Sequence, residues 1–238
     1  MLFLLDKLPA NEFSATNKSA PNTVIDMNRA HTYLDIIHFW FSTDFTHGMP
    51  TTIRNNFWFG ASPETDKLIT TRFKEHLEAA SAGAYNGWCK TPQGRLALII
   101  LLDQFPRNIY RGRAQAFAYD EQACRLCLQG LELGHDQQLI PAYRSFYYMP
   151  LEHSESLKRQ HRSVELFSRF YQHAHPAIRK TLKNSLEFAQ QHRDIIAKFN
   201  RFPHRNSLLG RQSTAQEIAY LEGTGVNFGQ GNNEQSNS

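Results

Sequence analysis

Seven consecutive apolar residues, Leu96 to Leu102, constrain the fold of this chain more than any other feature. A helix on the outside of a protein has one polar face, but this run is apolar on all sides. We therefore expect it to be the buried centre of a helical bundle. Thr91 and Pro92 provide an N-cap side chain and a proline at the first helical position, and Pro106 is expected to end the helix.

The same signals predict helices on both sides of this run. Apolar residues recur every three or four positions in several segments, and the predicted helices cover residues 26–41, 63–83, 114–133, 141–148, 150–172 and 176–199. Ser213 to Glu217 is a capping sequence for a last helix that ends near Gly223. No segment alternates with a period of two residues. The predicted fold class is all-α, a single bundle of about seven to nine helices.

The chain of 238 residues is long enough for one large core. Residues 1–25 and 224–238 are rich in small and polar residues without periodicity, and we expect a flexible N-terminal segment and a flexible C-terminal tail there. Residues 26–223 should form a single all-helical domain. Apolar residues make up 41% of the sequence and aromatic residues 12%, which excludes intrinsic disorder for this central part.

Composition also limits location and partners. The start of the chain lacks a secretion signal, and no apolar run approaches the roughly 20 residues that a membrane-spanning helix needs. Three cysteines are too few for a disulfide scaffold, and Cys124 and Cys127 on one helix are expected to pack in the core. We therefore predict a soluble, cytoplasmic protein. Its net charge of +4 is dispersed and favours an acidic partner only weakly.

The first segment with chemical potential follows the apolar run. Asp103 lies at the expected end of a buried helix, where it loses hydration and meets the negative end of the helix dipole. It therefore needs a cationic partner, and Arg107 and Arg111 are the nearest candidates. The alternatives are a structural ion pair and a functional site, and the sequence favours neither.

The second segment contains Glu152 and His153. On the predicted helix, His153 and Gln160 interrupt an otherwise apolar stripe, so both side chains should point inward. Glu152 is a candidate acid, although carboxylates in a first helical turn also complement the helix dipole.

The third segment is rich in arginine and histidine. His192 interrupts another apolar helical stripe, and a loop with proline and glycine follows, containing Arg201, His204, Arg205, Asn206 and Arg211. Arginine side chains can bind a carboxylate or a phosphate through paired hydrogen bonds, and histidine can transfer protons. The structural alternative is a loop that hydrogen-bonds the carbonyl groups at a helix C-terminus.

These three segments, at residues 101–108, 148–155 and 201–206, together resemble the bacterial domain-of-unknown-function family 924. The resemblance extends over about residues 34–230. It implies an all-helical fold with a tetratricopeptide-like superhelical arrangement, but it implies no activity, substrate or cofactor. This chain has Asn200 where a glycine commonly precedes the third segment.

Three functional hypotheses remain. The first is an enclosed site for a small anionic ligand, with His153, His204, Glu152 and Asp103 as candidate catalytic residues and with these candidate ligand-binding residues: Arg107, Arg111, Gln160, His192, Arg201, Arg205, Asn206 and Arg211. The second is a peptide-binding module of the helical-repeat kind. RNA binding is the weakest, because the basic charge is dispersed. No compact metal-binding spacing is present, and the sequence identifies neither the cofactor, the reaction nor the oligomeric state.

Overall fold

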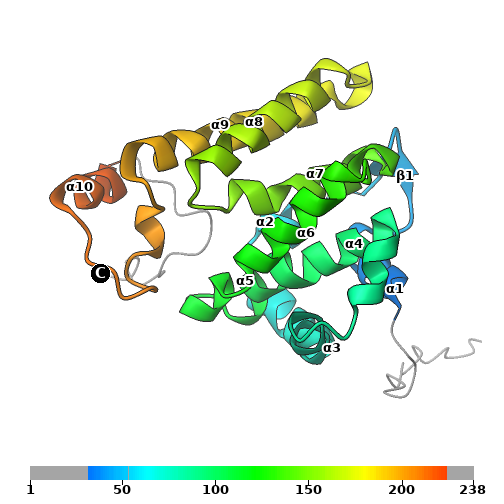
Figure 1. Cartoon of the computed structure of the whole chain (residues 1–238), viewed down its shortest axis with the longest axis horizontal. Helices are drawn as coiled ribbons and strands as arrows, with labels where there is room; N and C mark the ends of the chain where they lie inside the picture. Colours follow the sequence, from blue (N-terminus) through cyan, green and yellow to red (C-terminus); the bar gives the residue numbers. More distant parts are fainter. Residues whose placement is uncertain (1–31, 53, 224–238) are drawn as a thin grey trace, which may run out of the picture. The chain divides into compact units, whose positions relative to one another are not determined.

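The computed structural model describes residues 32–52 and 54–223, all of which belong to one compact unit. The predicted flexible segments 1–25 and 224–238 lie outside these residues, as do residues 26–31 of the first predicted helix. The longer helices, labelled in Figure 1, are α1 (Tyr33–Phe41), α3 (Pro63–Ser81), α4 (Pro92–Ile99), α6 (Asp120–Glu132), α7 (Pro141–Glu152), α8 (Leu157–Gln172), α9 (Arg179–Phe199) and α10 (Ala215–Gly223).

Shorter elements connect these helices. They are the helices α2 (Asn55–Phe59) and α5 (Phe105–Ile109), the π-helical turn η2 (Ile100–Gln104), and the 3₁₀ turns η1 (Asn86–Lys90), η3 (Ala114–Phe117), η4 (Asp136–Gln138), η5 (Pro176–Ile178) and η6 (Pro203–Arg205). Two-residue strands β1 (Phe45–Thr46) and β2 (Met49–Pro50) form an antiparallel pair that the sequence analysis did not predict. The all-α prediction is confirmed for the described residues. None of their helices is both long and apolar enough to span a bilayer.

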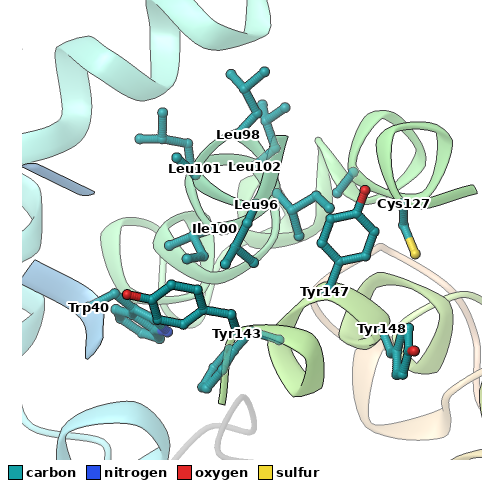
Figure 2. Close-up of a cluster of buried hydrophobic side chains, with 14 of the residues drawn as sticks. Trp40, Leu96, Leu98, Ile100, Leu101, Leu102, Cys127, Tyr143, Tyr147 and Tyr148 are labelled. Atoms are coloured by element: carbon teal, nitrogen blue, oxygen red, sulfur yellow. The ribbon is translucent and has the colours of Figure 1, made fainter. Parts of the chain in front are cut away.

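The run from Leu96 to Leu102 forms the centre of the core, as predicted. Each of its side chains is at most 2% exposed, and α4 packs against α1, α6 and α7. Figure 2 shows Leu96, Leu98, Ile100, Leu101 and Leu102 of this run in one cluster with Trp40 and Tyr147. Full burial of one leucine or isoleucine side chain contributes roughly 1.5–3 kcal/mol, so burial of this run stabilises the fold. Cys124 and Cys127 are also buried in this core, as expected.

Pro106 does not end the central helix, and that prediction was wrong. The chain continues from α4 through the π-helical turn η2 into α5, and the N–H of Phe105 bonds to the carbonyl of Ile100, five residues earlier. The π turn follows the end of α4 at Ile99, and α5 begins at Phe105, one residue before the proline. Pro106 therefore lies in the first turn of α5, where a missing N–H costs little.

Pro150 likewise lies inside a helix. The sequence pattern predicted helices at 141–148 and 150–172, but α7 continues to Glu152 and the break falls at residues 153–156. Pro150 is in the last turn of α7, so it removes one donor near the helix end, and the buried neighbours Tyr147 and Tyr148 fix the segment by packing. Two other predicted helices, at 114–133 and 176–199, begin with the separate turns η3 and η5.

The helices α8 and α9 pack side by side as a hairpin (Figure 1). At the end of α9, Asn200 adopts the left-handed conformation with φ of 56°. Glycine is the usual residue at this position of a helix cap, and asparagine is the best tolerated substitute. The chain then continues into η6, which contributes to the cavity wall described below.

Candidate functional site

A cavity of about 700 Å³ is lined by residues of α2, α5, α7 and α9 together with the segment 202–205. Seven of the predicted site residues line it: Arg107, Arg111, Glu152, His153, His192, His204 and Arg205. They come from all three sequence segments. The rings of His153 and His192 have their centres 6.2 Å apart, and Phe202 lies between His192 and His204, with ring centres 5.7 Å and 5.5 Å away.

Asp103 and His153 form a hydrogen-bonded pair at this cavity. Asp103 Oδ1 lies 2.7 Å from His153 Nδ1 and 3.4 Å from Arg107 Nη1. The Asp103 side chain is completely buried, within the π-helical turn. Burial raises the pKa of Asp103, but the charges of His153 and Arg107 and the hydrogen bonds from His153 and Gln104 lower it further than burial raises it. Asp103 is therefore ionised at neutral pH.

The ionised carboxylate fixes the tautomer of His153. Because a carboxylate can only accept hydrogen bonds, the imidazole hydrogen resides on Nδ1 and Nε2 keeps its lone pair. Burial and the charge of Arg107 lower the pKa of His153 below its ordinary value of 6.5, despite the opposing charge of Asp103. His153 is consequently neutral at pH 7, oriented by Asp103 and suited to act as a base.

Glu152 has the opposite character. Burial, together with the charge of Asp103, raises the pKa of Glu152 to about 8, so the carboxyl group is mostly protonated at neutral pH. Its Oε2 atom lies 3.7 Å from Nδ1 of His192. Glu152 is near the C-terminus of α7, where a carboxylate opposes the dipole. The alternative interpretation of Glu152 as a first-turn acid that complements the dipole was therefore wrong.

His192 and His204 are neutral members of the cavity wall. Nδ1 of His192 donates to the carbonyl of Phe188 over 2.8 Å, which leaves the lone pair on Nε2. Burial, together with neighbouring cationic groups, lowers the pKa of both histidines to about 3. Both therefore remain uncharged at neutral pH.

Arg205 provides a buried cation with spare hydrogen-bonding capacity. Its guanidinium carbon lies 4.4 Å from the ring centre of Phe117 and 4.6 Å from that of Phe202. Nη1 donates to Asp120 over 3.2 Å, and Nε is buried with no hydrogen-bond partner among the described residues. Burial lowers the pKa of Arg205 to about 10, although Asp120 opposes the change. An anion in the cavity would satisfy both the donor and the charge.

Two arginines of the cavity wall already have carboxylate partners. Arg107 donates to both oxygens of Asp120 at 2.8 Å and 3.0 Å, and Arg111 donates to Asp66 at 2.6 Å and 2.8 Å. These pairs hold the wall together. Asp66 and Asp120 were not predicted as site residues, because acids near a helix N-terminus have an ordinary structural explanation.

The remaining predicted ligand-binding residues, Gln160, Arg201, Asn206 and Arg211, do not line this cavity. Arg201 donates to both oxygens of Glu217, and Arg211 to both oxygens of Glu155. Gln160 donates to the carbonyls of Glu152 and Ser154. Asn206 donates to Ser213 and accepts a hydrogen bond from Arg211. These contacts fix the loop and the α7–α8 turn, but the two arginines pair with carboxylates and not with the helix C-terminal carbonyls that the structural alternative expected.

The aromatic part of the wall was not predicted from the sequence, and it includes Trp58, Phe59, Phe117 and Phe188. Phe188 was recognisable as a neighbour of the inward-facing His192, one helical turn away. The short helix α2, which carries Trp58 and Phe59, gave no comparable signal.

The described residues contain no group of three or more His, Cys, Asp or Glu side chains arranged to hold a metal ion. Cys124 is near the site but unsuited to nucleophilic attack. Its thiol donates to the carbonyl of Pro150 over 2.9 Å, and burial raises its pKa to about 12.

The family model described as a bacterial protein of unknown function (DUF924) matches residues 36–225. The chain belongs to the DUF924 family. The family resemblance inferred from the three sequence segments is thus confirmed. Every residue that lines the cavity falls within the range that matches DUF924.

This DUF924 chain is also similar to a solved structure, that of a protein of unknown function from Agrobacterium tumefaciens. The two share 33% sequence identity with a TM-score of 0.68, and the match covers 80% of this chain and 96% of the other. No curated protein matches this chain. The tetratricopeptide-like superhelical arrangement stays a prediction for this DUF924 protein.

Proposed function

We propose that this DUF924 protein is an enzyme that binds a small organic anion in the cavity and transfers a proton at that ligand, with His153 as the base. The observation that carries the proposal is the Asp103–His153 pair at a cavity that Arg205 also lines, and among the described residues the buried Nε of Arg205 has no hydrogen-bond partner. A base, its orienting carboxylate and an anion-binding group are the components of an acid–base site.

Arg205 supplies the binding of the anion. A carboxylate or phosphate oxygen that accepts from Nε would complete the hydrogen bonding of the guanidinium, whose position is fixed by its contacts with the rings of Phe117 and Phe202. Because the guanidinium is already held in place, little side-chain entropy is lost when the ligand binds.

His153 and Glu152 supply the proton transfers. Nε2 of His153 accepts a proton from the ligand, and the resulting imidazolium is stabilised by the ionised Asp103. Glu152, protonated at neutral pH, donates its proton to the ligand atom that gains negative charge. Exchange with solvent returns the proton from His153 to Glu152, so that no net proton is gained or lost.

The peptide-binding and RNA-binding alternatives stay untested predictions. RNA binding relied on the basic loop, and two arginines of that loop, Arg201 and Arg211, are paired with Glu217 and Glu155. Pairing of this kind reduces the charge that would be available to phosphates.

The proposal is tested by incubating the protein in D₂O with a defined mixture of organic acids and phosphate esters, and by following the mixture with NMR. We expect deuterium incorporation or consumption of at least one compound by the wild type, and a loss of at least about 100-fold in His153→Gln. Glu152→Gln preserves shape and is the second variant. His161→Gln alters an exposed histidine and is the matched control. Equal turnover by the wild type and both site variants would contradict the proposal.

A further inference from the structure

The cavity is elongated, because one face of α9 forms its wall over most of the helix. Thr181, Asn184, Ser185, Phe188 and His192 all line the cavity, and they recur at helical spacing. With a rise of about 1.5 Å per residue, the stripe from Thr181 to His192 extends over roughly 16 Å. A bound phosphate or acetate would occupy only a small part of that length.

The chemistry of the wall changes along this stripe. His192 is only 6% exposed, whereas Phe188, one turn earlier, is 51% exposed. Ser185 and Thr181 continue the wall with small polar side chains. The end at His192 therefore belongs to the buried acid–base group, and the rest of the stripe extends toward solvent.

Aromatic and sulfur-containing side chains from other elements complete the apolar part of the wall. Trp58 and Phe59 come from α2, Met149 from α7 and Phe167 from α8. Phe59 is 58% exposed. Two large rings, Phe59 and Phe188, are thus left partly in water at a cavity that they line, an arrangement typical of a surface that a ligand covers.

We infer that the ligand is an elongated amphipathic organic acid, whose acid group binds Arg205 beside His153 and whose apolar chain lies along α9 against Phe188 and Phe59. The inference rests on the proposed function, which supplies the anion-binding end. It adds the class of ligand. The cavity volume of about 700 Å³ is in the range of sites for drug-sized molecules, far above the needs of an inorganic anion.

Isothermal titration calorimetry with n-alkanoates tests this inference. Butyrate, hexanoate and octanoate carry the same acid group and differ only in chain length. Each methylene buried against the apolar wall should tighten binding roughly three- to fourfold. The corresponding n-alkanols, which lack the charge, should bind at least about tenfold more weakly to the wild type.

Variants separate the two ends of the ligand. Phe59→Ala and Phe188→Ala should reduce the gain per methylene, and folding should tolerate both changes because the side chains are more than half exposed. Leu133→Ala is the matched control, since Leu133 is 59% exposed and does not line the cavity. Arg205→Gln should weaken all the acids by a similar factor and leave the gain per methylene unchanged.

The outcomes distinguish the inference from the proposed function. If the alkanoates bind through Arg205 but their affinity does not increase with chain length, the inference is wrong and the proposed function stands. The same holds if only inorganic phosphate binds through Arg205. Alkanols that bind as tightly as the acids would show that the acid group does not contribute to binding, and would refute its assignment to Arg205. If neither phosphate nor any alkanoate binds in a manner that depends on Arg205, both the inference and the proposed function fail.

Discussion

Replacing Glu152 by glutamine should make the folded protein more resistant to alkaline pH. Glu152 is only 4% exposed, and burial and the charge of Asp103 raise its pKa from the ordinary value of 4.5 to about 8. Between these two values the folded protein keeps the proton, whereas the unfolded chain has lost it. Since the folded state then binds more protons, the free energy of unfolding falls as the pH rises through this interval.

The size of the effect follows from the pKa difference. Each pH unit within the interval lowers the free energy of unfolding by about 1.36 kcal/mol. Ionisation of this carboxyl group should therefore lower the free energy of unfolding of the wild type by roughly 3–4 kcal/mol between pH 5 and pH 8. Glutamine has almost the same shape and does not titrate. We therefore expect the difference in unfolding free energy, Glu152→Gln minus wild type, to increase by roughly 3–4 kcal/mol over that range.

Urea denaturation at a series of pH values, without ligand, measures this difference. Glu155→Gln is the control. The pKa of Glu155 is lowered, since its hydrogen bonds and ion pair with Arg211 outweigh burial, so this carboxylate is ionised in both states above pH 5. Its stability difference should be constant between pH 5 and pH 8. If the curves for Glu152→Gln and wild type are also parallel, Glu152 is not held protonated and its role as an acid is refuted.

Two further changes test the packing and the loop. A Cβ atom at Gly130 would lie 1.6 Å from Tyr147 Oη, so Gly130→Ala should lower the free energy of unfolding by roughly 1–3 kcal/mol. Gly87→Ala, with open space around it, should change it by less than about 0.5 kcal/mol in the same urea titration, and equal effects would refute the close approach. Arg201→Gln removes the bidentate partner of Glu217 and should lower the free energy of unfolding without changing alkanoate affinity. A loss of affinity with unchanged stability would instead support the sequence prediction that Arg201 binds ligand.

Apolar patterning was sufficient to predict the core. Leu96 to Leu102 had no polar face, and no location other than the bundle centre suits such a helix. Proline positions were less informative. Both Pro106 and Pro150 lie inside helical segments, because a π-helical turn and a late position in α7 reduce the cost of the missing donor. Such tertiary and register effects leave no local signal in the sequence.

The candidate site was only partly recognisable from sequence. His192 was identified correctly as an inward-facing residue because it follows an amphipathic period that α9 retains. His153 was also predicted to point inward, but that prediction placed it on a helix over residues 150–172. In the structure His153 lies just beyond the end of α7 and not within a helix. Spacing along the chain does not reveal that Arg205 is close to Asp120, because that contact joins residues distant in sequence. Which arginine keeps a spare donor depends on such contacts.

The most direct test of the organic-anion site is NMR of the protein with ¹⁵N-labelled histidine side chains, titrated with hexanoate and, separately, with inorganic phosphate. We predict that the free protein contains His153 as the Nδ1–H tautomer, and that His153, His192 and His204 shift together with one Kd. The exposed His161 should not respond. If the three cavity histidines are unaffected by both probes, or if His161 shifts equally with them, the cavity is not the site of organic-anion binding.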